Sequence, residues 1–197
     1  MSLFDFLDLS GTLVFAIAGG YRAVRHDLDF LGVLVLAVLT GIGGGLIRDM
    51  LLGATPAASL NDERYLIICV AGGLLALFAA RKVAKHWNVV QFADAIGLGV
   101  FAAVGASKGL AYGLGPVGVM IMAALTATGG GVVRDVLVRE VPAVIRHDFY
   151  ATAALIGGGV YYLALMGDVA EPVALWTTAL VTTAIRFTAM WRKWGVD

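Results

Sequence analysis

The feature that most constrains this chain is a ten-residue motif that occurs twice. Residues 40–49 read TGIGGGLIRD, and residues 126–135, 86 positions later, read TATGGGVVRD. Each copy places three glycines and an Arg-Asp pair within a long apolar segment. Interior glycines weaken a helix, and charged residues are costly inside a membrane. Because both features recur at matched positions, we expect the two halves of the chain to share one purpose.

Composition indicates the class of protein. The chain of 197 residues is 60% hydrophobic and 14% charged, whereas soluble domains average about 45–50% and about 25%. Alternating strand patterns are absent, so we predict an all-α integral membrane protein. The formal net charge is zero, which gives no indication of a nucleic-acid partner. No nucleotide motif or nucleophile–base pair is present, so no enzyme activity or catalytic residue is predicted.

The apolar residues fall into seven segments, which predict seven transmembrane helices in a single domain spanning residues 1–197. Several segments are shorter than the ~20 residues that cross a bilayer, but flanking aromatic residues can extend them. The three histidines, His26, His86 and His147, lie between segments, so no metal site is expected. The segments cover residues 7–21, 30–52, 65–80, 89–107, 117–138, 150–166 and 172–190.

The loops between these segments differ in basic residues. If the N-terminus is outside, nine basic residues lie inside and two lie outside, which is a clear positive-inside bias. We therefore expect a multi-pass protein of the plasma (inner) membrane of a prokaryote, with its N-terminus outside and its C-terminus inside. The inner residues are Arg22, Arg25, Arg81, Lys82, Lys85, Arg139, Arg146, Arg192 and Lys193, and the outer ones are Arg64 and Lys108.

The motif belongs to a longer repeat. Repeat one covers about residues 5–80, repeat two about 91–166, and a seventh helix at about 172–190 stands outside both. Each repeat holds three helices, and because three is odd, the second repeat enters the membrane from the opposite side. This is the inverted-repeat plan of many transport proteins. Matched residues are Asp8 and Asp94, Phe15 and Phe101, Arg22 and Lys108, Pro56 and Pro142, and, after a one-residue gap, Tyr65 and Tyr150.

The glycine triplets allow two interpretations. Small residues four positions apart in each copy would let helices pack closely in lipid. Alternatively, three consecutive glycines unwind the helix and free backbone carbonyls that can coordinate a cation. We predict that helices two and five are broken at the triplets and that the breaks line one pathway. The hydroxyls of Thr40 and Thr126, one turn earlier, would add to that lining.

The Arg-Asp pairs are expected to face the bundle interior, as intramembrane charges generally do. Adjacent residues on a helix do not face one another, so Arg48 is not expected to pair with Asp49. We predict cross-repeat pairs instead, Arg48 with Asp135 and Arg134 with Asp49. Such pairs would either lock the two repeats together or act as a gate.

Four further charges lie at the ends of the first helix of each repeat. Asp8 and Asp94 begin these helices, where an acidic residue commonly stabilises the helix dipole. Arg22 and Lys108 end them, where a long basic side chain commonly extends to the membrane interface. We expect these structural roles for all four residues.

The two inverted repeats, the lone seventh helix and the doubled Gly-Gly-Gly-x-x-Arg-Asp motif resemble the prokaryotic TRIC proteins. These are relatives of the trimeric intracellular cation channels, and the resemblance covers essentially the whole chain. It implies a homotrimer among membrane lipids, with one pore per protomer for monovalent cations, chiefly potassium. It also implies helices bent at Gly43–Gly45 and Gly129–Gly131. Animal members carry a Lys-Glu-Gly signature that is absent here, so their voltage or lipid regulation is not carried over.

The function expected first is a potassium-conducting cation channel, with no cofactor other than the transported ion. Bacterial proteins with the same motif have also been described as glycine transporters, so a secondary transporter of a small zwitterion is the alternative. A third class is a non-transporting scaffold, which dry and continuous second and fifth helices would support. The expected pathway residues are Thr40, Gly43, Gly44, Gly45, Arg48, Asp49, Thr126, Gly129, Gly130, Gly131, Arg134 and Asp135.

Overall fold

The computed structural model describes residues 2–83, 87–146 and 149–192, and within these ranges the protein is a bundle of helices. Lys85, His86, His147 and Lys193, which entered the expectations on orientation and metal binding, lie outside these ranges. The seven long helices of the described residues are α1 (Leu3–Arg25), α2 (Phe30–Leu51), α4 (Glu63–Val83), α5 (Trp87–Ala111), α6 (Pro116–Leu137), α8 (Ala151–Met166) and α9 (Glu171–Trp191), and two short ones are α3 (Ala58–Asn61) and α7 (Ala143–Arg146).

The ends of these helices follow local sequence signals. Ser2 and Asp5 form a capping box at the start of α1, and the Asp29 side chain accepts from the Gly32 amide to cap α2. Pro116 begins α6, where its missing N–H and fixed φ are compatible with a helix start. Local capping thus sets where the apolar segments enter the bundle.

Length and composition agree with a membrane protein. Five stretches of the described residues are long and apolar enough to cross a bilayer: Leu3–Arg25, Phe30–Leu51, Gln91–Ala111, Pro116–Leu137 and Glu171–Trp191, and Ala151–Met166 is a shorter apolar helix. The prediction of an all-helical fold is confirmed.

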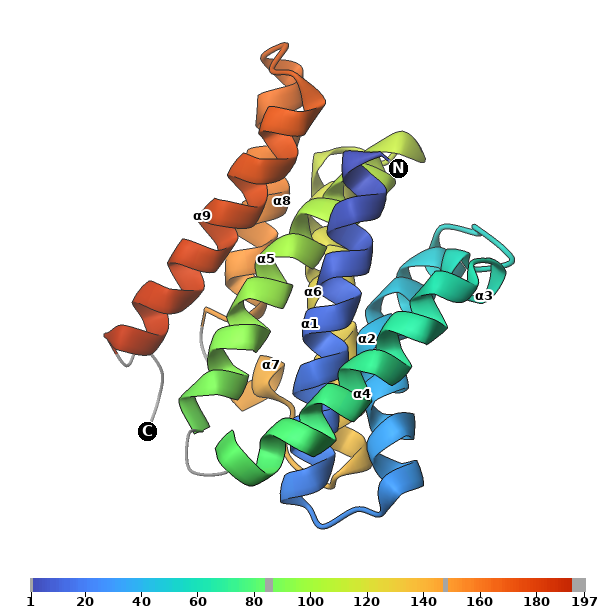
Figure 1. The fold of residues 1–197 in the computed structure, drawn as a ribbon. Coiled ribbons are helices and arrows are strands. Elements are labelled where there is room, and N and C mark those ends of the chain that lie inside the picture. Colours follow the sequence, from blue (N-terminus) through green and yellow to red (C-terminus); the bar gives the residue numbers. More distant parts are fainter. Residues whose placement is uncertain (1, 84–86, 147–148, 193–197) are drawn as a thin grey trace.

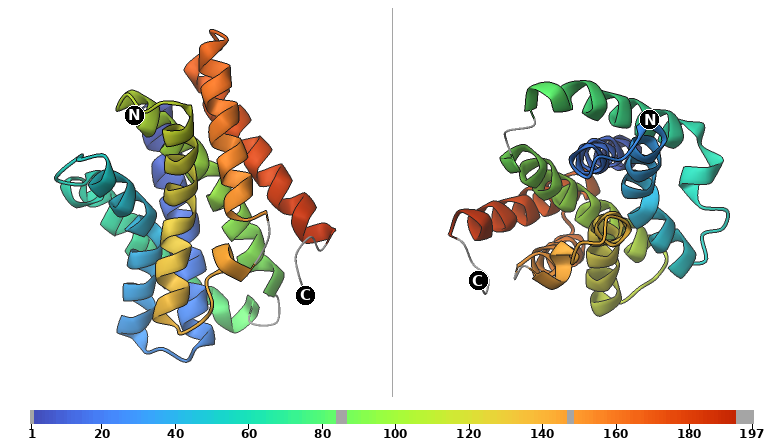
Figure 2. Two further views of the ribbon diagram at one scale, coloured as in Figure 1. Left: turned by 180° about the vertical axis from the view of Figure 1, so that it is seen from behind. Right: turned by 90° about the horizontal axis from the view of Figure 1, so that it is seen from below.

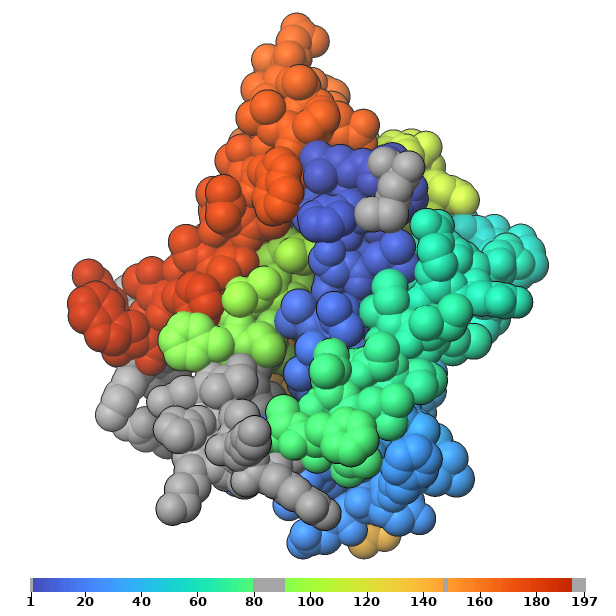
Figure 3. Space-filling view, viewed as in Figure 1, coloured from blue at the N-terminus to red at the C-terminus, as the bar shows by residue number. Residues whose placement is uncertain are grey.

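The helices form two interlocked halves. Helices α1, α2 and α4 pack together, as do α5, α6 and α8, and contacts of α1 with α5 and of α2 with α6 join the halves (Figures 1 and 2). Helices α1 and α5 run in opposite directions, so the halves are inverted relative to each other. Helix α9 packs on α5 and α8, and α1 is visible between α4 and α9 on the face in Figure 3.

The predicted breaks at the glycine triplets are wrong. Both α2 and α6 continue as α-helix through Gly43–Gly45 and Gly129–Gly131. The two helices cross there with their backbones in contact: a Cβ added to Gly44 would lie 2.1 Å from the Thr126 carbonyl oxygen, and one added to Gly130 would lie 2.1 Å from that of Thr40. The triplets therefore permit close approach of two intact helices.

The physical reason for continuity is the membrane itself. An unwound segment would leave backbone donors and acceptors without partners, and the bilayer core offers no water to satisfy them. The cost of about 1 kcal/mol for each interior glycine is smaller than that of several unsatisfied groups. The third glycine of each triplet has another role, since the would-be Cβ atoms of Gly45 and Gly131 face the Arg48 and Arg134 guanidinium groups at 3.6 and 3.7 Å.

The two threonines of the motif turn their hydroxyls back onto their own helices. Thr40 Oγ1 donates to the Leu36 carbonyl at 2.6 Å, and Thr126 Oγ1 donates to the Met122 carbonyl at 2.7 Å. Both side chains are fully buried. In this conformation both hydroxyls donate their hydrogen bonds within their own helices.

Candidate functional site

Two charged clusters lie at opposite ends of the bundle, near the C-terminal ends of α2 and α6. At the end that holds the N-terminus, Asp49 is 1% exposed and is bound by three donors. Its Oδ1 accepts from Arg48 Nε and from Lys108 Nζ, each at 2.7 Å, and its Oδ2 accepts from the Ala58 amide at 3.0 Å. Lys108 comes from the second repeat, so this carboxylate joins the two halves.

A second carboxylate supports Arg48 from α1. Asp8 Oδ2 lies 3.5 Å from Arg48 Nη2 and accepts from the Tyr65 hydroxyl at 2.8 Å. Arg48 is 1% exposed, and two aspartates compensate its charge. We call Asp8, Arg48, Asp49, Tyr65 and Lys108 the Asp49 cluster.

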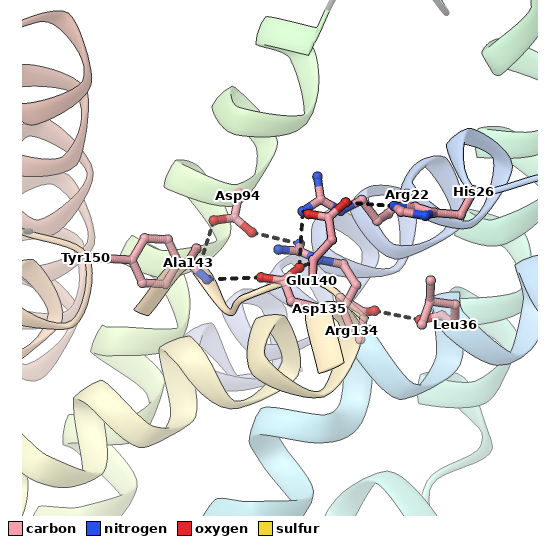
Figure 4. Close-up of polar contacts among 10 residues, drawn as sticks. Arg22, His26, Leu36, Asp94, Arg134, Asp135, Glu140, Ala143 and Tyr150 are labelled. Carbon is pink, nitrogen blue, oxygen red and sulfur yellow. Dashed lines mark hydrogen bonds and ion pairs between the residues drawn. The ribbon is translucent and has the colours of Figure 1, made fainter. Parts of the chain in front are cut away.

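The same arrangement recurs at the other end of the bundle (Figure 4). Asp135 Oδ1 accepts from Arg134 Nε at 2.9 Å, its Oδ2 accepts from the Ala143 amide at 3.1 Å, and Arg22 Nη2 of repeat one lies 3.5 Å from it. Arg134 Nη1 also donates to Asp94 at 2.9 Å, and the Tyr150 hydroxyl donates to Asp94 at 2.5 Å. We call Arg22, Asp94, Arg134, Asp135 and Tyr150 the Asp135 cluster.

These contacts correct the predicted pairing of the motif charges. Arg48 and Arg134 bind aspartates of their own repeats, including the adjacent Asp49 and Asp135. Neighbouring positions point apart on a helix surface, but an arginine side chain is long enough to fold back onto the next residue. The repeats do pair across their boundary, through Lys108 with Asp49 and Arg22 with Asp135.

The structural roles expected for the four flanking charges are also wrong. Asp8 and Asp94 are buried ligands of the motif arginines. Arg22 and Lys108 bind the motif aspartates with side chains only 9% and 16% exposed. The repeat register contained this signal, because all four positions are matched, but sequence alone did not show which helix ends meet.

Each cluster faces a cavity. The Asp49 cavity has a volume of about 410 Å³ and is lined by Asp49, Lys108 and Tyr112 together with the loop after α2. The Asp135 cavity has a volume of about 90 Å³, and its lining includes Arg22, Asp94, Arg134, Asp135 and Glu140. Both cavities contain charged side chains that would be costly against lipid, so both are suited to water and ions.

The centre of the bundle between the clusters is apolar and tightly packed. Phe15 and Phe101, which are matched in the repeat, form an edge-to-face pair with ring centroids 5.1 Å apart, and both are at most 1% exposed. A cavity of only about 10 Å³ lies between Arg48 and Phe101, about the smallest that can hold one water. The repeat matches these two rings, but nothing in the sequence indicates their role.

Helix α9 adds a cation to the Asp135 end. The Arg186 guanidinium lies 4.9 Å from the centre of the Tyr150 ring and lines the Asp135 cavity. This cation–π contact has no counterpart by symmetry, because α9 stands outside the repeats. Among the described residues, no group of three or more His, Cys, Asp or Glu side chains is arranged to hold a metal ion.

Comparison with known proteins identifies the family. The family model described as glycine transporter matches residues 5–81 and 91–166. The UPF0126 membrane protein of Vibrio cholerae is 42% identical over 197 residues, which cover 100% of this chain and 82% of the relative. The UPF0126 inner membrane protein YadS of Escherichia coli is 40% identical over 157 residues, which cover 79% of this chain and 75% of the relative.

Solved structures give the same answer. One solved structure is that of a TRIC cation channel in which the structural basis for conductance was determined. It is 41% identical to this chain with a TM-score of 0.90, and the match covers 100% of this chain and 97% of the channel's chain. The TRIC trimeric intracellular cation channel orthologue from Rhodobacter sphaeroides is 32% identical with a TM-score of 0.93, over 97% and 99% of the two chains. The chain therefore belongs to the prokaryotic TRIC channel family of UPF0126 membrane proteins, which are multi-pass helical proteins with a duplicated domain and not enzymes.

Proposed function

We propose that the protein is a channel for monovalent cations, chiefly potassium, with one pathway in each protomer. One observation carries the proposal: each cavity leads to a buried carboxylate that a cation from the opposite repeat occupies. At Asp49 that cation is the Lys108 ammonium, at 2.7 Å. A potassium ion entering the cavity can replace such a group without leaving the carboxylate uncompensated. The two contacts between repeats, Lys108 with Asp49 and Arg22 with Asp135, thus mark places where a permeant cation can bind.

The pathway would connect the two clusters past the α2–α6 crossing. Phe15 and Phe101 and the glycine contacts fill that centre, so the conformation described corresponds to a closed state. Opening requires α2 and α6 to move apart, with Arg48, Asp49, Arg134 and Asp135 at the two entrances. Because the acidic and basic groups are paired, the net field is small, and we expect only modest selectivity between potassium and sodium.

We further propose a homotrimer with its N-terminus outside and its C-terminus inside. The Rhodobacter sphaeroides relative is named as a trimeric channel, and the basic residues of the sequence favour this orientation. The Asp49 cavity would then face outward and the Asp135 cavity inward.

A transporter of a small zwitterion is the second candidate. The family model that matches both repeats is described as a glycine transporter. Each cluster offers guanidinium and carboxylate groups that could hold the carboxylate and the ammonium of glycine. Transport would need the two ends to open alternately rather than together.

The test is reconstitution of the purified protein in planar bilayers under potassium/sodium bi-ionic conditions. Unitary currents far above ~10³ ions per second exceed the usual turnover of carriers and would support the channel. Saturable glycine uptake into proteoliposomes without such currents would support the transporter. The continuous α2 and α6 also agree with a non-transporting scaffold, which predicts neither current nor uptake.

A further inference from the structure

The loops that border the two cavities have matching backbones. After α2, the Ala54 amide donates to the Asp49 carbonyl at 2.8 Å, and after α6 the Glu140 amide donates to the Asp135 carbonyl at 2.9 Å. The residue before each also has positive φ, 69° at Gly53 and 59° at Arg139. Ala54 and Glu140 therefore occupy equivalent positions at the two ends of the bundle.

The loops after α1 and α5 match in the same way. The His26 amide donates to the Arg22 carbonyl at 3.2 Å, and the Tyr112 amide donates to the Lys108 carbonyl at 3.1 Å. Each is followed by a residue with positive φ, Asp27 at 53° and Gly113 at 78°. His26 and Tyr112 are thus equivalent, and the two ends differ in side chains rather than in backbone.

Among the described residues, these positions join the repeats at the Asp135 end and not at the Asp49 end. Glu140 Oε2 accepts from Arg22 Nη2, and Glu140 Oε1 lies 2.7 Å from His26 Nε2 (Figure 4). At the Asp49 end the equivalent side chains are a methyl group and a tyrosine that is 50% exposed. Both Ala54 and Tyr112 line the Asp49 cavity.

We propose that Glu140 acts as a latch, bridging α1 and the end of α6 through Arg22 and His26, and that it holds the Asp135 end closed. The described residues form no equivalent bridge at the Asp49 end, so the two entrances are gated differently. Glu140 and Arg22 both line the Asp135 cavity, so the bridge between them lies at that cavity. This inference rests on the proposed pathway, because a latch matters only where an ion or solute must pass.

Cysteine accessibility tests the latch without requiring current. Ala143 lines the Asp135 cavity and Ala58 lines the Asp49 cavity, so each is replaced by cysteine in a Cys69→Ala background. In nanodiscs a charged thiol reagent reaches both faces of the membrane. Glu140→Ala should raise the labelling rate of Ala143→Cys on the order of threefold, as expected for loss of a partly exposed ion pair, and should leave that of Ala58→Cys unchanged.

A matched variant tests the inference in the opposite direction. Ala54→Glu places a carboxylate near Lys108 and should slow labelling of Ala58→Cys. Glu140→Gln keeps the side-chain size but removes the charge, and it replaces Glu140→Ala if that variant does not fold. If folded Glu140 variants label Ala143→Cys at the wild-type rate, the latch is wrong. In bilayers the Glu140 variants should raise open probability. Absence of wild-type current would contradict the channel and not the latch.

Discussion

At the scale of single residues, Asp49 is a buried carboxylate with two basic partners. It is 1% exposed and compensates Arg48 and Lys108 together. Removing one member of a buried pair costs about 3–5 kcal/mol, because the remaining charge has no compensation. We predict that Asp49→Asn lowers the free energy of unfolding by this amount, measured by chemical unfolding in detergent micelles.

A double-mutant cycle of Asp49→Asn with Lys108→Met measures the coupling free energy of this ion pair between the repeats. Because Asp49 is the carboxylate that Lys108 binds, neutralising both residues removes the pair together, and the double variant should be less destabilised than the sum of the single changes. Groups in direct contact typically couple by at least about 0.5 kcal/mol. Asp62→Asn is the matched control, since Asp62 pairs with Arg64 at the surface and its loss should have little effect. Additive single effects would argue against direct coupling of Asp49 to Lys108.

At the scale of helices, the α2–α6 crossing separates the roles of adjacent glycines. A Cβ at Gly44 would meet the Thr126 carbonyl oxygen at 2.1 Å, whereas the atom nearest to a Cβ at Gly45 would be an Arg48 nitrogen at 3.6 Å. We predict that Gly44→Ala destabilises the protein by about 1–3 kcal/mol, typical of overpacking. Gly45→Ala should be close to neutral or slightly stabilising. Thermal unfolding of the two variants in the same detergent measures the difference, and equal stability would exclude a tight crossing.

The α2–α6 crossing also separates the features that can be predicted from the sequence from those that cannot. Apolar segments and the repeat were sufficient to predict a helical membrane fold, because both are local patterns or matches along the chain. They did not predict intact helices at the triplets, since the carbonyl groups that pack on Gly44 and Gly130 come from a helix about 86 residues away. For the same reason Arg22 and Lys108 were assigned to the interface, although they bind buried aspartates.

At the scale of the whole molecule, the two inverted repeats give both ends of the bundle the same backbone arrangement. The side chains that differ between the repeats make the two ends unequal. Matching backbones place Arg-Asp clusters at both ends. Glu140, His26 and Arg186 then add contacts at the Asp135 end that have no counterpart among the described residues of the Asp49 end. A protein with two identical entrances would have no structural basis for treating its two sides differently. The extra contacts provide one, and they come from loops and from α9 rather than from the repeated core.

The proposed trimer should contain one pathway in each protomer. The Asp49 cluster, the Asp135 cluster and the α2–α6 crossing between them are joined by contacts within one protomer, so we expect each protomer to conduct independently. Ala58→Cys in a Cys69→Ala background places one thiol at each Asp49 cavity. A bulky cationic thiol reagent should then reduce the current of one trimer in as many as three equal steps. The Cys69→Ala protein alone should not respond, and loss of all current in a single step would indicate one shared central pore.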